Sequence, residues 1–255
     1  MTELNNVPAY DEIEVAFTQP GCPFCGLLDQ AANMIIDSML WELVNDPQNQ
    51  DRIKQARGSC QRHGWMLVRS GAAMGITILM KSVIDTLLEV LDHHAGGTSA
   101  DISSHRLWHT LQLPHHTIKN TLMIELAPQT TCPVCVDIEQ IEQNYINTLL
   151  ESLTGPESLA EAFHQSDGLC LQHFRDTLRE GVPGEALDTL VSVQRDIWQR
   201  LSDELAEFIR KNDYRYANEP VGKEGNAWRR ALAVTSGPSP KTVGQGGGLT
   251  GSRIN

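Results

Sequence analysis

Cys-Pro-Phe-Cys at residues 22–25 and Cys-Pro-Val-Cys at residues 132–135 are the stretches that decide how this chain folds. Each is followed, after 34 intervening residues, by a Cys-x-x-His motif, and the pattern uses all six cysteines of the chain. Three thiolates and one imidazole form the ligand set of a closed tetrahedral zinc site. The motif residues are Cys22, Cys25, Cys60 and His63 in the first copy and Cys132, Cys135, Cys170 and His173 in the second.

This pattern predicts two zinc ions per chain, each bound by the four ligands of one copy. Four protein ligands leave no coordination position for water or substrate, so the predicted role of the metal is structural. The thiols of a Cys-Pro-x-Cys motif at the start of a helix have their pKa lowered by the helix dipole, which favours metal binding. Ordinary buried cysteines and an iron–sulfur cluster are the alternative interpretations.

The resemblance between the two copies extends beyond the ligands. A shift of 110 residues places each ligand of the first copy on its counterpart, and places Gly58 on Gly168. Apolar positions also coincide, for example Leu28 with Ile138. An internal repeat of this kind indicates two homologous halves that arose by duplication.

Each half is predicted to be helical, because its apolar residues recur with a period near 3.6 and sustained alternation is absent. Proline directly after the first cysteine favours a helix start there, and these helices are expected to run to about Leu43 and Leu153. Shorter helices are expected over 48–56 and 157–164. A longer helix should begin near each Cys-x-x-His. Interruptions of that helix are expected at Gly71 and Gly75 in the first half and at 181–184 in the second.

The predicted fold is therefore mostly α, with two homologous helical halves, each organised around a Cys3His zinc site. The expected domains are a first zinc-binding repeat over 1–94, a connector over 95–122, a second repeat over 123–235, and a disordered tail over 236–255. The connector includes a short helix near 104–111 and is rich in histidine. We interpret it as a polar connector rather than an auxiliary metal or pH-sensitive site. Six of the nine histidines of the chain lie in this connector or directly before it, namely His93, His94, His105, His109, His115 and His116.

Composition limits the classes of partner. The 255 residues have a net charge of −12, and the pI is about 5.1, which argues against binding to nucleic acid. The most apolar stretch, residues 71–91, contains Lys81, Asp85 and Glu89 at helical spacing, so no membrane span is expected. No secretory signal is visible at the N-terminus, and we expect a cytoplasmic protein with reduced thiols.

These features favour a zinc-stabilised protein-interaction or regulatory module whose partner is another protein, and a homodimer is one candidate form. No phosphate-binding loop and no hydrolase or metalloprotease motif is present, so catalysis is not expected. The alternative is a thiol-based redox protein or zinc-linked redox switch. Cys-Pro-Phe-Cys is similar to the motif of glutaredoxin-like proteins, and residues 13–17 could form a preceding strand. The βαβ units of that fold are missing from the sequence. A further alternative is an enzyme with a small-molecule site between the halves.

The motifs resemble those of an uncharacterised bacterial protein family. Its members pair Cys-Pro-x-Cys with Gly-(Phe/Leu)-Cys-x-x-His, usually twice. The second half has the full form, Gly-Leu-Cys-Leu-Gln-His at residues 168–173, whereas residues 58–63 read Gly-Ser-Cys-Gln-Arg-His. Asp-Tyr-Arg-Tyr at 213–216 and Trp-Arg-Arg-Ala at 228–231 are also similar. The resemblance covers about residues 7 to 237. It implies paired metal sites and no particular activity.

Overall fold

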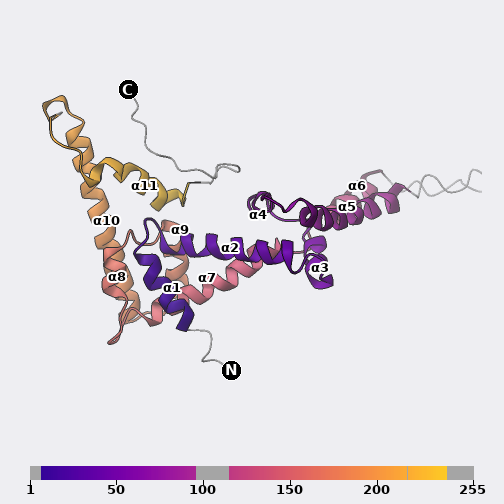
Figure 1. Ribbon diagram of the computed structural model, residues 1–255, viewed down its shortest axis with the longest axis horizontal. Coiled ribbons are helices and arrows are strands. Elements are labelled where there is room, and N and C mark those ends of the chain that lie inside the picture. The colour runs from indigo at the N-terminus through magenta and orange to yellow at the C-terminus, as the bar shows by residue number, and fades with distance from the viewer. Residues whose placement is uncertain (1–6, 96–114, 217, 240–255) are drawn as a thin grey trace, which may run out of the picture. The chain divides into compact units, whose positions relative to one another are not determined.

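The computed structural model describes residues 7–95, 115–216 and 218–239, and every regular element in these ranges is a helix (Figure 1). The prediction of a mostly α protein is confirmed. None of the helices in these ranges is long and apolar enough to cross a membrane. The elements are α1 (Val7–Phe17), α2 (Pro23–Trp41), α3 (Pro47–Gln55), α4 (Gln61–Met66), α5 (Ala73–Ala95), α6 (His115–Leu126), α7 (Pro133–Glu151), α8 (Ala160–Gln165), α9 (Leu171–Glu180), α10 (Glu185–Lys211), η2 (Tyr214–Tyr216), η3 (Lys223–Asn226) and α11 (Ala227–Ser236).

Helices α2 and α7 begin where the sequence predicts. Both start at the proline that follows a cysteine, and both contain 19 residues. Proline suits the first helical position, because its missing N–H group would have no partner within the helix. Both helices end two residues before their expected ends. Residues 13–17 lie in helix α1, so the strand that a glutaredoxin-like fold would need there is not formed.

The remaining breaks follow the glycines and prolines, with one exception. Gly71 lies in the gap between α4 and α5 with a φ of +80°, and residues 181–184 separate α9 from α10. Gly75, however, lies inside α5 and does not interrupt it. A Cβ atom at Gly75 would lie 2.8 Å from the backbone oxygen of Leu40, so close packing explains this glycine.

The chain divides into two compact units. Unit 1 comprises Met1–Ala31 and Ile138–Asn255, and unit 2 comprises Ala32–Asp137. Helices α2 and α7 each contribute residues to both units. The units differ from the predicted division at 1–94, 95–122 and 123–235, because each contains parts of both predicted repeats. The expected helix near 104–111 and most of the predicted tail, residues 240–255, lie outside the described residues.

The core of unit 1 is formed by α1, the first turns of α2, and α7 to α10. Its few aromatic residues are concentrated here. Phe24 and Phe163 are completely buried, and the rings of Phe17 and Phe163 lie 5.4 Å apart. Burying one such side chain contributes about 1.5–3 kcal/mol relative to exposure. Aromatic side chains thus contribute to the core of this unit, although they make up only 5% of the chain.

In unit 2, α5 packs against α3 and α6. Ile53 and Leu79 are completely buried. Arg57 donates a hydrogen bond of 2.6 Å to the backbone oxygen of Glu125. The backbone N–H of Gln129 donates one of 2.8 Å to the backbone oxygen of Gln55. These bonds attach the last turn of α6, and the segment that follows it, to the end of α3.

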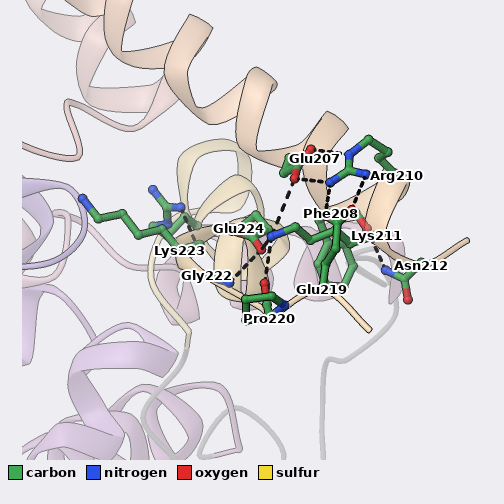
Figure 2. A network of polar contacts seen from close by, with 11 residues as sticks. Glu207, Phe208, Arg210, Lys211, Asn212, Glu219, Pro220, Gly222, Lys223 and Glu224 are labelled. Carbon is green, nitrogen blue, oxygen red and sulfur yellow. Dashed lines mark hydrogen bonds and ion pairs between the residues drawn. The ribbon is translucent and has the colours of Figure 1, made fainter. Parts of the chain in front are cut away.

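The chain after α10 is held against the end of that helix by a polar network (Figure 2). Lys211 donates a hydrogen bond of 2.7 Å to Glu224, which also accepts one of 2.7 Å from the backbone N–H of Gly222. Arg210 forms an ion pair with Glu219. The network fixes the position of η3, and α11 follows directly and packs against α9 and α10.

Candidate metal centres

The structure brings the eight predicted ligands together in two groups of four, but in a different combination from the expected one. We expected each group to come from one repeat. Instead, each Cys-Pro-x-Cys motif meets the Cys-x-x-His motif of the other repeat. Site 1 consists of Cys22, Cys25, Cys170 and His173, and site 2 consists of Cys60, His63, Cys132 and Cys135.

The course of α2 and α7 through the two units accounts for this correction. Helix α2 begins in unit 1 and ends in unit 2, where α3 packs against α5, so Cys60 lies in a different unit from Cys25. Helix α7 begins in unit 2 and ends in unit 1, where α8 packs against α10, so Cys170 lies in a different unit from Cys135.

The ligand atoms of site 1 are closely spaced. The Sγ atoms of Cys25 and Cys170 lie 3.8 Å apart. The Nδ1 atom of His173 lies 3.3 Å from Cys22, 3.4 Å from Cys25 and 3.2 Å from Cys170. Cys170 and His173 are buried, and the rings of His173 and Phe24 form a T-shaped contact with their centroids 5.9 Å apart. Site 1 is thus anchored on the core of unit 1.

Site 2 repeats this geometry in unit 2. The Sγ atoms of Cys60 and Cys135 lie 3.7 Å apart. The Nδ1 atom of His63 lies 3.4 Å from Cys60, 3.7 Å from Cys132 and 3.3 Å from Cys135. All six cysteines of the two sites are free thiols, with no disulfide between them.

These spacings fit a tetrahedral metal. With metal–sulfur bonds of about 2.3 Å and metal–nitrogen bonds of about 2.0–2.1 Å, two sulfurs should lie about 3.8 Å apart, and sulfur and nitrogen about 3.5 Å apart. The measured separations of 3.7 and 3.8 Å between sulfurs, and of 3.2–3.7 Å between sulfur and nitrogen, agree with both values. Either group of four could therefore hold one metal ion.

Local backbone structure presents the second pair of ligands in each site. Cys60 and Cys170 precede α4 and α9 with nearly the same extended conformation, at ψ of 163° in both. Neither side chain caps its helix, so each Sγ remains available to the site. The ligand histidine follows one turn later, on the same side of the helix as the cysteine.

The loop before Cys170 is fixed by a buried amide. The Gln194 side chain accepts a hydrogen bond of 2.9 Å from the N–H of Leu169 and donates one of 3.3 Å to its carbonyl oxygen. Gln194 is fully buried. Gly168 has a φ of +76°, which favours glycine, and a Cβ there would lie 2.8 Å from the Gln194 amide nitrogen. Packing against α10 thus holds the loop in place.

The thiols influence one another strongly. Hydrogen bonds with the thiols of Cys170 and Cys22, together with burial, raise the pKa of Cys25 far above its usual range. Burial and the neighbouring Cys60 thiol raise the pKa of Cys135 to about 12. Burial opposes ionisation of Cys132, but hydrogen bonds from His63 and from backbone N–H groups lower its pKa to about 6. If all three thiols of a site ionise, their repulsion needs a cation to neutralise it, and a divalent metal ion would supply one.

The sequence did not point to Glu142, which lies beside site 1. Its Oε1 atom is 3.4 Å from the Nε2 atom of His173, on the side of the imidazole opposite the thiols. Burial raises the pKa of Glu142, and His173 opposes that shift. No motif marks this residue, because its role depends on the meeting of α7 with α9. Its counterpart 110 residues earlier is Ala32.

A third group of ligand-type atoms joins α5 to α6. The atoms of His93, His94 and Glu125 lie within 4.8 Å of one another, and the Nε2 atom of His94 is 2.9 Å from the Glu125 carboxylate. Of the other histidines of the predicted connector, His105 and His109 lie outside the described residues. His115 and His116 begin α6.

A cavity of about 430 Å³ opens beside site 1 within unit 1. Cys22 and Cys170 lie in its wall, together with residues of α10 and α11. Arg230 extends from α11 to form ion pairs with Glu204 and Asp167 in the cavity. The Trp-Arg-Arg-Ala motif at residues 228–231 thus contributes a charged side chain next to the candidate metal site.

Comparison with known proteins identifies the family but no activity. Residues 1–242 match the family described as "Family of unknown function (DUF6062)". The chain is 23% identical over 229 residues to "Uncharacterized 23.9 kDa protein in xynA 3'region" from Caldicellulosiruptor sp. (strain Rt8B.4). The aligned residues cover 87% of this chain and 97% of that relative. No solved structure matches the chain. The resemblance to an uncharacterised family is confirmed, and the chain belongs to the DUF6062 family, whose function is unknown.

Proposed function

We propose that this chain is a zinc-stabilised helical module that binds another protein or regulates one, with one zinc ion at each site. The spacing of the four ligand atoms in each site is the observation that carries the proposal. Zinc is the metal most often bound by three cysteines and one histidine in a closed structural site. Because four protein ligands complete a tetrahedron, no position remains for a substrate, and the proposed role of the metal is structural.

In this crossed arrangement, in which each site combines residues of both repeats, the proposed ions would have a particular role. Each ion takes two ligands from the first repeat and two from the second, so each would connect the two repeats. We attribute the repeats to a duplication. In support, the bounds of α2 and α7 coincide after a shift of 110 residues, and α4 and α9 begin at equivalent positions. Structural zinc contributes on the order of 10 kcal/mol or more to folding in small zinc domains.

A protein partner is supported by the exposed apolar side chains of α5. Ile84, Leu88 and Leu91 lie at helical spacing and are exposed by 53%, 50% and 42%. An apolar row of this kind suits contact with another helix. A second copy of this chain is the first partner to test, and we propose a cytoplasmic location, where the thiols stay reduced. Light scattering of the purified protein at several concentrations would measure its mass in solution.

The alternative function is that of a redox switch, in which oxidation of a Cys-Pro-x-Cys pair to a disulfide releases zinc. The observation that favours it is that both pairs are free thiols and only partly buried at Cys22, Cys25 and Cys135. Such a step removes two electrons from two thiolates and needs an oxidant such as a peroxide or a disulfide.

One experiment separates the two functions. The metal content and the reactive thiols are measured together in protein purified without added metal. The structural function predicts about two zinc ions per chain and slow reaction of all six thiols until a chelator is added. Protein that contains no metal, and whose Cys22–Cys25 or Cys132–Cys135 pair cycles readily between dithiol and disulfide, would contradict it.

A further inference from the structure

The two metal sites differ in what lies behind the ligand histidine. In site 1 the Nδ1 atom of His173 faces the three sulfurs, so Nε2 is the ring nitrogen that faces away from them. Glu142 occupies that side, with Oε1 at 3.4 Å from Nε2. This carboxylate oxygen is buried and makes no hydrogen bond among the described residues. The polar contact that the structure gives it is the one with the Nε2 atom of His173.

A neutral imidazole that binds a metal through one nitrogen carries its proton on the other. A carboxylate that accepts this proton fixes the tautomer and the ring orientation, and makes the ligand nitrogen more basic. Helix α7 presents Glu142 to α9 within unit 1, and the Phe24 ring contacts the same imidazole in a T-shaped arrangement. Two neighbouring side chains therefore restrain the orientation of His173.

Site 2 lacks this support. Its histidine, His63, also directs Nδ1 to the sulfurs. Within the part of the chain that the structure describes, no acidic side chain is hydrogen-bonded to His63 or paired with it. The position that corresponds to Glu142 in the repeat is Ala32, a buried residue without a polar side chain. The two sites therefore have the same ligands and different surroundings.

We propose that Glu142 is a positioning residue for His173, and that site 1 consequently binds its metal more tightly than site 2. This inference rests on the proposed function, because it requires that both sites bind zinc. It makes site 2 the place where zinc is exchanged or lost first, while unit 1 keeps its ion. The chain would thus contain one site that retains its metal and one that releases it more readily.

The experiment is a titration of the zinc-loaded full chain with a chromogenic chelator. Long-range proton–nitrogen NMR spectra of the imidazole rings identify which site loses its ion. In the wild type, the signals of His63 should change before those of His173. Glu142→Ala should weaken site 1 by about 10–100-fold, the usual effect of losing such a partner, and leave site 2 unchanged.

Two further variants separate positioning from a general effect on stability. Glu142→Gln keeps an oxygen that can accept the Nε2 proton, so it should retain most of the affinity of site 1. Glu139→Ala removes an exposed carboxylate from the preceding turn of α7 and should behave as the wild type. If Glu142→Ala does not fold, the order of release in the wild type still tests the inference.

The outcomes are distinct. Equal release from both sites in the wild type, or a Glu142→Ala protein that retains zinc as the wild type does, would overturn the inference and leave the zinc sites intact. Loss of affinity in Glu142→Gln as large as in Glu142→Ala would also overturn it. A chain that binds no zinc at either site would overturn both the inference and the proposed function.

Discussion

The Sγ atom of Cys25 lies 3.8 Å from that of Cys170, although the two residues are 145 positions apart in the chain. The cysteine that follows Cys25 in the sequence, Cys60, instead lies 3.7 Å from Cys135. Each site thus combines the Cys-Pro-x-Cys motif of one repeat with the Cys-x-x-His motif of the other. This arrangement leads to predictions that a metal site within one repeat would not make.

Pairs of ligand substitutions test the crossed arrangement directly. Cys25→Ser combined with His173→Ala damages one site twice, so the protein should retain about one zinc ion. Cys25→Ser combined with His63→Ala damages both sites, so the protein should retain none. The zinc content is measured by atomic spectroscopy after gel filtration. The reverse result would be one zinc ion in the variant with His63→Ala and none in the variant with His173→Ala. It would show that Cys25 and His63 share a site, and hence that each site lies within one repeat.

Removal of the metal should unfold much of the chain. Structural zinc in small domains is worth about 10–16 kcal/mol at neutral pH, which is as large as the whole usual stability of a domain, about 5–15 kcal/mol. We expect a strong chelator to lower the melting temperature and the helical circular dichroism signal, and added zinc to restore both. A melting curve that a chelator does not change would show that the sites have no structural role.

Two helical glycines should respond in opposite directions to alanine. Alanine in place of glycine within a helix usually stabilises by about 1 kcal/mol. Gly64→Ala should follow that rule, since its nearest neighbouring atom would lie 3.8 Å away. Gly75→Ala should lower the free energy of unfolding by about 1–3 kcal/mol, because its Cβ would lie 2.8 Å from the Leu40 backbone oxygen. Denaturant titration of both variants measures the difference, and a stabilised Gly75→Ala protein would contradict the packing of α5.

The carboxyl group of Glu224 should stay ionised in mild acid. A hydrogen bond from Lys211, and one from the backbone N–H of Gly222, lower the pKa of Glu224 to about 2 from an ordinary value of 4.5. Because the pKa is lower in the folded state, the contribution to stability is present above pH 4.5 and is lost as the pH falls towards 2. Carbon NMR of the Glu224 carboxyl should show little change between pH 7 and 4.5.

Lys211→Met provides the control for this prediction. It removes the main donor to Glu224, so the pKa of the carboxyl should rise towards 4.5 and its signal should shift over the same pH range. An unchanged titration curve in this variant would show that Lys211 does not stabilise the ionised form. The network that fixes α11 would then rest on the backbone N–H groups and on Arg210.

Much of the fold could be predicted from local sequence. Pro23 and Pro133 mark the starts of two helices, because the preference of proline for the first turn is a local property. Gly71 and residues 181–184 mark breaks for a similar reason. The function of Gly75 could not be predicted in this way, since only the contact with Leu40 distinguishes it from a helix-breaking glycine. Glu142 likewise has no local signal, because its role comes from a histidine on another helix.

The sequence by itself determined the eight cysteine and histidine positions of the two candidate metal sites, the starts of the helices beside them and the 110-residue spacing between the two copies of the motif. These properties follow from the chemistry of cysteine and histidine and from the period of the apolar residues, which act over a few residues of the chain. Tertiary structure decided which four ligands meet. Helices α2 and α7 each begin in one compact unit and end in the other, where the helix that follows packs, so each Cys-Pro-x-Cys motif meets the Cys-x-x-His motif of the other copy.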